Sequence, residues 1–239
     1  MQVTLRLERT DHATAKRCVE AWHYSHAMPA ATDRYAVFED GQLVGVVLFG
    51  PGAGGVTRFG ARLGVDRQDV RELVRVALTT HQIPVSRVVA ICARLLRRDR
   101  PNLRLLMSYA DPNEGHHGGI YQAGGWVYTG TSTPGTAYIV VHGQPTHRRT
   151  CNSLYGTSSV AKLRATVDPN AQPMPALPKH RYLMALDPSI RDQVAKMARP
   201  YPKRARSETS DTADSQSAEG GATPTLALHD AQPARFAIS

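Results

Sequence analysis

A short apolar run that opens into a loop of titratable side chains is the feature that most limits the possible folds of this chain. Residues 105–109 (LLMSY) precede Ala-Asp-Pro, which predicts a buried strand that runs into a turn. Asp111 therefore lies at the carboxyl end of that strand, next to His116 and His117. The following segment, 118–126 (GGIYQAGGW), predicts a close backbone approach to a ligand, a short helix and a glycine stop. We expect Tyr121 on that helix to face the same cleft as Asp111.

The elements around this stretch follow a mixed order. Strand-like runs occupy segments 2–8, 34–39, 42–48, 71–79, 126–131 and 136–141. Helices are predicted from Thr10 or Asp11 to about Trp22, and over 84–98, where apolar residues recur at helical spacing. Asp40-Gly41 predicts a tight hairpin turn, and a Thr-Pro-Gly turn predicts a second hairpin between the last two strands. The order favours an α/β fold of the α+β type, with one mixed central sheet flanked by helices.

The charge of the chain predicts a polyanionic partner. The formal net charge is +9, and the segment after residue 204 carries −3, which leaves +12 on residues 1–204. Such a field favours nucleic acid or an anionic surface, and a soluble basic protein is the alternative. Three separated cysteines indicate a reducing compartment, and no run approaches the ~18 apolar residues of a membrane span. We expect a cytoplasmic protein with no membrane partner; no oligomeric state is indicated.

Two segments have phosphate-binding features. Pro84 suits the first turn of a helix, so Ser86 and Arg87 lie where free amides and the helix dipole favour a cofactor pyrophosphate. An ordinary capped helix is the alternative. Residues 50–55 (GPGAGG) lack the Gly-Lys-Ser/Thr that completes a nucleotide loop, which favours a flexible hairpin exit.

The order of elements resembles the GCN5-related N-acyltransferase (GNAT) fold, and segment 108–130, with HYSHAMP (23–29) and KHRYLMALD (179–187), resembles the Mom family of phage DNA-modification proteins. The resemblance covers roughly residues 1–200. It implies acetyl-CoA or a related acyl-CoA between splayed strands at 71–79 and 103–109. The implied cofactor contacts are Arg75, Ser86, Arg87 and Ser108. The usual coenzyme A signature, Arg/Gln-x-x-Gly-x-Gly/Ala, is absent before Pro84.

The Mom resemblance also implies a reaction, the addition of a carbamoylmethyl group to the exocyclic amine of adenine in DNA, which protects a phage genome from restriction. That amine is a poor nucleophile, so the base must leave the duplex, stack on a ring and lose a proton as it attacks. Asp111 is the candidate general base, and Tyr121 matches the tyrosine that protonates the leaving thiolate. His23 and Tyr24 are further candidate catalytic residues, and Tyr24 or Trp22 can stack on the base. Plain acyl transfer would give an amide, so the extra nitrogen needs another source.

Each of these assignments has a structural alternative. Asp111 before proline can simply cap a turn, and Tyr121 can be a core aromatic. His23 and His26, spaced i,i+3, can bind one metal, and Asp111, His116 or His117 can complete a facial site of the kind iron uses. Surface or hydrogen-bonded histidines are the other interpretation.

The second half of the chain supports double-stranded DNA as the partner. Spaced basic clusters alternate with tyrosines, as a surface that tracks a nucleic-acid backbone requires. The DNA contacts expected there are Arg148, Arg149, Lys179 and Arg181, and a solvated basic face is the alternative. We predict a catalytic core over 1–145, a basic DNA-contacting extension over 146–206 with an extended proline-rich connector at 169–178, and a disordered acidic tail over 207–239. The competing functions are an ordinary N-acetyltransferase of another amine and a non-catalytic DNA-binding protein.

Overall fold

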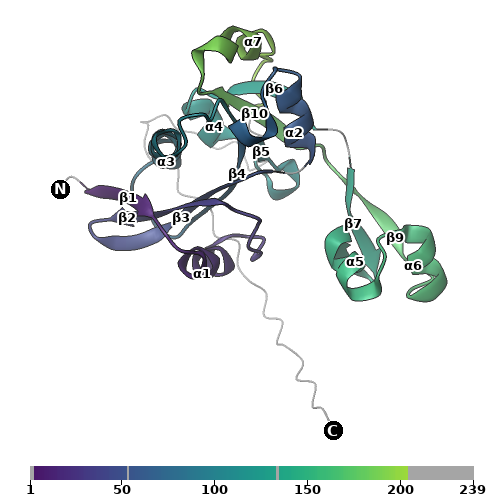
Figure 1. Ribbon diagram of the computed structural model, residues 1–239. Coiled ribbons are helices and arrows are strands. Elements are labelled where there is room, and N and C mark those ends of the chain that lie inside the picture. Colours follow the sequence, from purple (N-terminus) through teal and green to yellow (C-terminus); the bar gives the residue numbers. More distant parts are fainter. Residues whose placement is uncertain (1–2, 53, 133–134, 204–239) are drawn as a thin grey trace, which may run out of the picture. The chain divides into compact units, whose positions relative to one another are not determined.

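A seven-stranded sheet forms the centre of the computed structural model, which describes residues 3–52, 54–132 and 135–203 (Figure 1). The strand order is β1-β2-β3-β4-β5-β10-β6. The strands are β1 (Leu5–Arg9), β2 (Asp33–Glu39), β3 (Gln42–Gly50), β4 (Val70–Leu78), β5 (Leu105–Ala110), β6 (Val127–Thr131) and β10 (His180–Ala185). The predicted turn between β2 and β3 is confirmed, since Asp40 and Gly41 have φ angles of 48° and 81°, as tight hairpin turns require.

The two central strands, β4 and β5, separate along their length. They are the parallel pair of this sheet, whereas its other neighbours are antiparallel. Their pairing covers only Val70–Glu72 with Leu105–Met107, so β4 leaves β5 beyond Glu72. The predicted mixed sheet with splayed central strands, in the GNAT-like order, is therefore confirmed.

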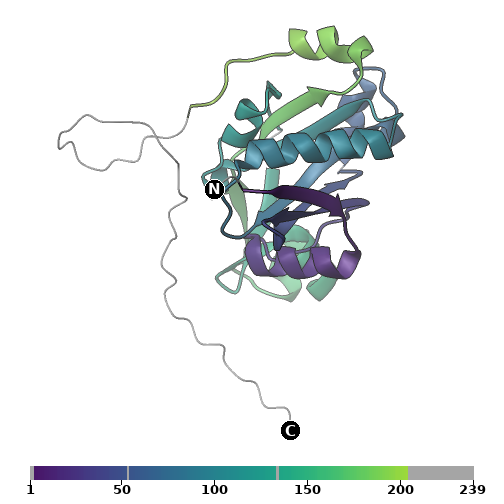
Figure 2. The same cartoon turned by 90° about the vertical axis from the view of Figure 1, so that its left-hand side faces the viewer.

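Helices cover both faces of this sheet. In Figure 2 the purple α1 (His12–Trp22) and the blue-green α3 (Val85–Asp99) lie on opposite sides of the strands. α3 and α4 (Gly119–Ala123) pack with Trp126 and Tyr182. α1 packs on Val46 and Leu48 of the other face, where α2 (Gly54–Ala61) and α7 (Arg191–Lys196) form a further cluster. Single 3₁₀ turns lie at Arg67–Asp69, Pro112–Glu114 and Pro188–Ile190. The alternation of buried residues along β3 thus supplies a core on each face.

A second, three-stranded sheet is inserted in the chain between β6 and β10. Its order is β8-β7-β9, and Ile139, Cys151 and Leu163 are buried in its own small core. The elements are β7 (Gly135–Val141), β8 (Gln144–His147), α5 (Arg148–Tyr155), α6 (Val160–Thr166) and β9 (Gln172–Ala176). We call residues 132–179 the insert.

The predicted second hairpin, between 126–131 and 136–141, is wrong. β6 pairs with β10, whereas β7 pairs with β8 and β9. The reason is burial on both faces: Tyr182 packs in the α3 cluster and Leu183 in the α2 cluster, so β10 suits the protected position between β5 and β6. β7 instead buries Ile139 against α5 and α6.

Two connecting segments are more regular than the sequence predicts. The proline-rich connector is extended as expected, but residues 172–176 form β9 at the edge of the small sheet, where missing N–H donors are tolerated. The glycine-rich segment after β3 is not simply a flexible exit, because α2 begins at Gly54.

The predicted domains remain a prediction, but the central sheet takes strands from both sides of residue 145, since β10 follows the insert. The predicted acidic tail, 207–239, lies outside the described residues. Across the described ranges no helix has the length and apolar character needed to cross a bilayer. All three cysteines are buried free thiols.

Candidate active site

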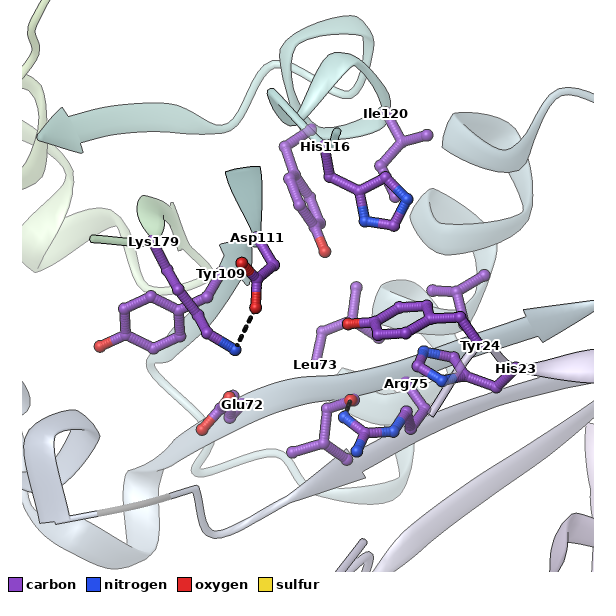
Figure 3. Close-up of a pocket in the computed structure, with 13 residues that line it drawn as sticks. His23, Tyr24, Glu72, Leu73, Arg75, Tyr109, Asp111, His116, Ile120 and Lys179 are labelled. Atoms are coloured by element: carbon purple, nitrogen blue, oxygen red, sulfur yellow. Dashed lines mark hydrogen bonds and ion pairs between the residues drawn. The ribbon is translucent and has the colours of Figure 1, made fainter. Parts of the chain in front are cut away.

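A cavity of about 190 Å³ lies where β4 and β5 diverge (Figure 3). It is lined by residues from six parts of the chain: the loop after α1, strand β4, the end of β5, the turn and loop that follow β5, helix α4 and the last residue of the insert. The lining residues are His23, Tyr24, Glu72, Leu73, Val74, Arg75, Val76, Tyr109, Asp111, His116, Ile120, Tyr121 and Lys179. The four predicted catalytic residues, His23, Tyr24, Asp111 and Tyr121, therefore line one cavity.

The carboxylate of Asp111 is held from two sides. Asp111 caps the 3₁₀ turn after β5, and its Oδ1 accepts hydrogen bonds from the backbone N–H (3.0 Å) and the side-chain amide (2.7 Å) of Asn113. Its Oδ2 lies 2.7 Å from Nζ of Lys179. Burial alone would raise the pKa of Asp111, but the bonds from Lys179 and Asn113 outweigh it and lower that pKa. The predicted turn cap and the predicted cavity carboxylate are thus the same group.

Lys179 was expected on the DNA surface, and the structure places it in the cavity as the partner of Asp111. Two hydrogen bonds join the two ends of the insert: the backbone N–H of Ser132 donates to the carbonyl of Lys179, and the backbone N–H of Lys179 donates to Oγ of Ser132. Asn113 exchanges hydrogen bonds with the backbone of Leu177, at 3.0 and 3.3 Å. The end of the insert is consequently fixed to the turn that carries Asp111.

Replacing Lys179 with methionine should raise the pKa of Asp111, because an attractive charge and a hydrogen bond are lost while the burial remains. A base acts only when deprotonated, so the acidic limb of the pH–rate profile should move to higher pH. Lys162→Met removes an equal charge from an exposed position on α6 and should leave that limb in place. If the acidic limb of the pH–rate profile stays in place in Lys179→Met, the ionisation of Asp111 does not control the rate.

The hydroxyl of Tyr121 is buried at the cavity wall. It lies 2.8 Å from Oγ of Ser108, which is also 2.9 Å from the carbonyl oxygen of Leu73. The Ser108 hydroxyl can donate to only one of these two oxygens. When it donates to the Leu73 carbonyl, the Tyr121 hydroxyl donates to Ser108. Burial raises the pKa of Tyr121 to about 12, which keeps the phenol protonated at neutral pH. Ser108, expected against the cofactor, instead lies behind Tyr121 and does not line the cavity.

His23 and Tyr24 form an aromatic wall on the opposite side. The backbone N–H of Ser25 donates to Nδ1 of His23 at 3.1 Å, so Nδ1 is unprotonated and Nε2 carries the hydrogen. Burial, followed by the charges of Arg75, His116 and His26, lowers the pKa of His23 to about 4, so the ring is neutral at neutral pH. The Tyr24 ring packs on His23 at 4.2 Å and is 48% exposed, which leaves an aromatic face open for stacking. Trp22, the alternative stacking residue, does not line the cavity.

An iron site is not supported. Nδ1 of His26 donates to the carbonyl of Glu20 at 2.7 Å, which ties that ring to α1. His116 lines the cavity at the edge of the Tyr24 ring, at 5.7 Å. Among the described residues no three His, Cys, Asp or Glu side chains are grouped to hold a metal. In this structure His23 and His26 accept or donate hydrogen bonds within their own loop and α1, and His23 packs on Tyr24.

The expected acyl-CoA contacts are divided between two places. Arg75 lines the cavity; within the described chain its guanidinium forms no ion pair, and its buried Nε has no hydrogen-bond partner. A hydrogen-bond acceptor in the acyl arm of a bound acyl-CoA would suit the Nε–H of Arg75 and the unpaired edge of β4. Ser86 and Arg87 lie outside the cavity, in the first turn of α3.

The amides just before α3 are partly occupied by the protein itself. Glu39, which is buried, accepts the backbone N–H groups of Gln82 and Ile83 at 2.8 Å each. Pro84 has no N–H, so the first helical turn is the remaining source of amide donors for a pyrophosphate. The residues that line the cavity suit the acyl end of such a donor, and binding of its phosphate end by Ser86 and Arg87 stays a prediction.

The remaining expected DNA contacts lie elsewhere. Arg148, at the start of α5, donates to the carbonyl of Ser158 at 3.1 Å, and Arg149 follows it on that helix. Arg181 bonds to Thr129 of β6 and packs over the ring of Phe59. The position of Lys179 in the cavity and the bridging bonds of Asn113 were not predicted from the sequence. The Asp-Pro-Asn turn was a signal for Asn113, because such turns place the third side chain beside the first.

The model of the Mom protein family matches residues 4–203. The chain belongs to this family. As a member of the Mom family with a sheet of the acyltransferase order, it has the features of an acyltransferase, and both observations support acyl transfer. The sequence motifs that suggested the family lie at or beside the cavity.

Solved structures with a similar fold are acetyltransferases. A Bacillus subtilis acetyltransferase in complex with CoA is 8% identical with a TM-score of 0.42, covering 78% of this chain and all of its own. A putative acetyltransferase from Acinetobacter baylyi is 12% identical with a TM-score of 0.44, covering 78% and 96%. The aminoglycoside acetyltransferase AAC(6')-Ib with acetyl-CoA is 14% identical with a TM-score of 0.41, covering 87% and 100%. A search of curated proteins gave no match. At these TM-scores the likeness carries no information about substrate.

Proposed function

We propose that this Mom-family protein modifies DNA by transferring a carbamoylmethyl group, derived from an acyl-CoA, to the exocyclic amine of adenine. The modification would protect phage or prophage DNA from restriction in the cytoplasm of the host. One observation carries the proposal: a single cavity brings together a carboxylate, a protonated phenol and an open aromatic ring, those of Asp111, Tyr121 and Tyr24.

Each of these groups answers a demand of the reaction. The exposed ring of Tyr24 offers a stacking surface to an extruded adenine. Asp111 is ionised, and Oδ2 is the oxygen that takes the amine proton once Lys179 turns from it toward DNA phosphate. A bound acyl-CoA would supply a thioester: attack of the amine on its carbonyl carbon forms an amide and expels the thiolate, and the nitrogen of a carbamoylmethyl group would come from a further nitrogen-bearing substrate. Tyr121 holds a proton at its hydroxyl, on the cavity wall, for that leaving group.

The nature of the adduct tests this function and separates it from its alternatives. DNA from bacteria that express the protein would be digested to nucleosides and compared by mass spectrometry with DNA from cells that express Asp111→Asn. We expect a new deoxyadenosine with the mass of one carbamoylmethyl group. An acetylated nucleoside would indicate an ordinary N-acetyltransferase, and unmodified DNA despite tight DNA binding would indicate a non-catalytic DNA-binding protein.

DNA binding should weaken steeply as salt rises, because residues 1–204 carry +12 and bound basic side chains release condensed counterions. The measurement is a titration of fluorescent duplex DNA at several salt concentrations. Removing residues 207–239 should leave the affinity unchanged or slightly higher, since that segment is acidic. A flat salt dependence would contradict DNA as the partner.

A further inference from the structure

A cluster of three arginines, Arg62, Arg181 and Arg199, lies beside the cavity, on the α2 side of β10. Arg181 is half-buried there: Nε donates to Thr129 Oγ1 and Nη2 to the Thr129 carbonyl, both at 2.9 Å. Its guanidinium carbon lies 4.1 Å from the centre of the Phe59 ring, and that of Arg62 lies 5.9 Å from the same ring. Two arginines from distant parts of the chain therefore meet over one aromatic side chain.

Arg199 completes the cluster from the segment after α7. Its backbone N–H donates to the carbonyl of Tyr128 at 2.9 Å, and its side chain lies along Gly130. A β-carbon at Gly130 would be 3.4 Å from the Cδ, Nε and Cζ atoms of Arg199. This close approach places the guanidinium beside Gly130, the neighbour in sequence of Thr129, and the charge of Arg199 acts on Arg181.

Within the described residues, no acidic side chain balances the positive charges of this cluster. In the part of the chain that the structure describes, no carboxylate forms an ion pair with Arg62, Arg181 or Arg199. Partial burial, followed by the charges of Arg62 and Arg199, lowers the pKa of Arg181. An anion that binds here would relieve this repulsion.

The free end of Arg181 has the right shape for a phosphate. One edge of its guanidinium, Nε and Nη2, is occupied by Thr129, so Nη1 and the second hydrogen of Nη2 point away from that contact. These donors form the fork that binds two oxygens of one phosphate. The Phe59 ring holds the guanidinium plane in position, and the exposed Arg62 and Arg199 add charge beside it.

The cluster is adjacent to the cavity. Arg181 is paired in register with Tyr109 of β5, which lines the cavity. It also follows Lys179, the partner of Asp111, by two residues, a step of roughly 7 Å in extended chain. A polyanion that reaches the cavity mouth at Lys179 would therefore pass over Arg181.

We propose that Arg62, Arg181 and Arg199 bind a backbone phosphate of the DNA strand next to the adenine that enters the cavity. This assignment rests on the proposed function. A phosphate of the donor is the other source of the same chemistry, but Ser86 and Arg87 are on α3, which packs on the opposite face of the sheet. The phosphate contact would fix the strand while the neighbouring base is extruded.

The test compares charge-matched double variants for binding to duplex DNA. Arg62→Gln with Arg199→Gln removes two exposed charges from the cluster, and Arg94→Gln with Arg97→Gln removes two exposed charges from α3. All measurements use the Asp111→Asn background, so they do not depend on turnover. We expect the cluster pair to weaken binding about tenfold and to lower the salt dependence by about one counterion, with little change in the α3 pair. Equal losses in the two pairs would overturn the proposal.

A second measurement identifies the phosphate. Neutral methylphosphonates would replace one phosphate at a time around the target adenine, with Arg181→Lys as the variant, because lysine keeps the charge and loses the fork. At one position, the methylphosphonate should weaken DNA binding about tenfold when the protein has Arg181. The same methylphosphonate should weaken binding by Arg181→Lys much less, because that variant has already lost the contact. If the losses caused by the methylphosphonate and by Arg181→Lys add at every position, the assignment is wrong. It is also wrong if Arg181→Lys weakens coenzyme A binding and leaves DNA affinity unchanged. Absence of an adenine adduct with these results intact would count against the proposed reaction alone.

Discussion

Asp111→Asn is expected to abolish modification of adenine while the protein remains folded. The substitution keeps the size of the side chain and one oxygen, which can still accept the two hydrogen bonds from Asn113 that shape the turn. It removes the negative charge that faces Lys179 and, in the proposed reaction, accepts the amine proton. Loss of a general base typically costs about 10²- to 10⁴-fold in rate. The adduct assay measures the loss, and a melting curve checks the fold.

The matched control for Asp111 is Glu114→Gln, which removes a carboxylate from the same turn at an exposed position. It should retain nearly full activity, because Glu114 does not line the cavity. Lys179 is 47% exposed, so water can solvate its charge when Asp111 is neutralised, and the melting temperature should change little. Normal turnover by Asp111→Asn would remove Asp111 as the base and leave it as a turn cap.

Tyr121→Phe is the second change with a large expected effect. It deletes one hydroxyl and keeps the ring that packs against Trp126 and Tyr182. If that hydroxyl donates its proton to the leaving group, it acts mainly in the transition state, so coenzyme A should bind nearly normally while turnover falls about 10²- to 10⁴-fold. A coenzyme A titration, a melting curve and the adduct assay measure the three properties.

Tyr182→Phe is the control, because it removes the same group from a neighbouring buried tyrosine. Its hydroxyl donates to the carbonyl of His117 and does not line the cavity. Loss of that bond should cost about 1 kcal/mol of stability and little activity. If the two phenylalanine variants turn over equally fast, Tyr121 is a core residue.

Local rules explain why much of the fold was predictable. Asp11 caps α1 by accepting the N–H of Thr14, and Asp40-Gly41 turns β2 into β3, as neighbouring residues alone require. Asp111 and Tyr121 are only ten residues apart, so a strand, a turn and a short helix suffice to bring them to one cavity. The family resemblance supplied the GNAT-like order, which the parallel pairing of β4 and β5 confirms.

The predictions that the structure did not support depended on residues far away in the chain. The hairpin predicted for 126–141 fails because β10, about fifty residues later, is apolar on both faces and takes the place beside β6. The iron site has no support, because among the described residues no three His, Cys, Asp or Glu side chains are grouped to hold a metal. Ser108 lies behind Tyr121 because the Leu73 carbonyl, on another strand, is its second partner.

The sequence by itself determined the elements, the charge and the position of Asp111 and Tyr121, since hydrophobic period, turn chemistry and net charge are properties of neighbouring residues. Only the tertiary structure decided which charges meet. Lys179 faces Asp111 across 68 positions of sequence, whereas Arg181, two residues later, joins Arg62 and Arg199. Side chains two residues apart in a strand share a face, so the strand pattern does not separate Lys179 from Arg181. The splay of β4 and β5 opens the cavity beside Lys179, whereas α2 and the segment after α7 bring Arg62 and Arg199 to Arg181. The electrostatic partner of each basic residue was therefore set by the packing of the sheet.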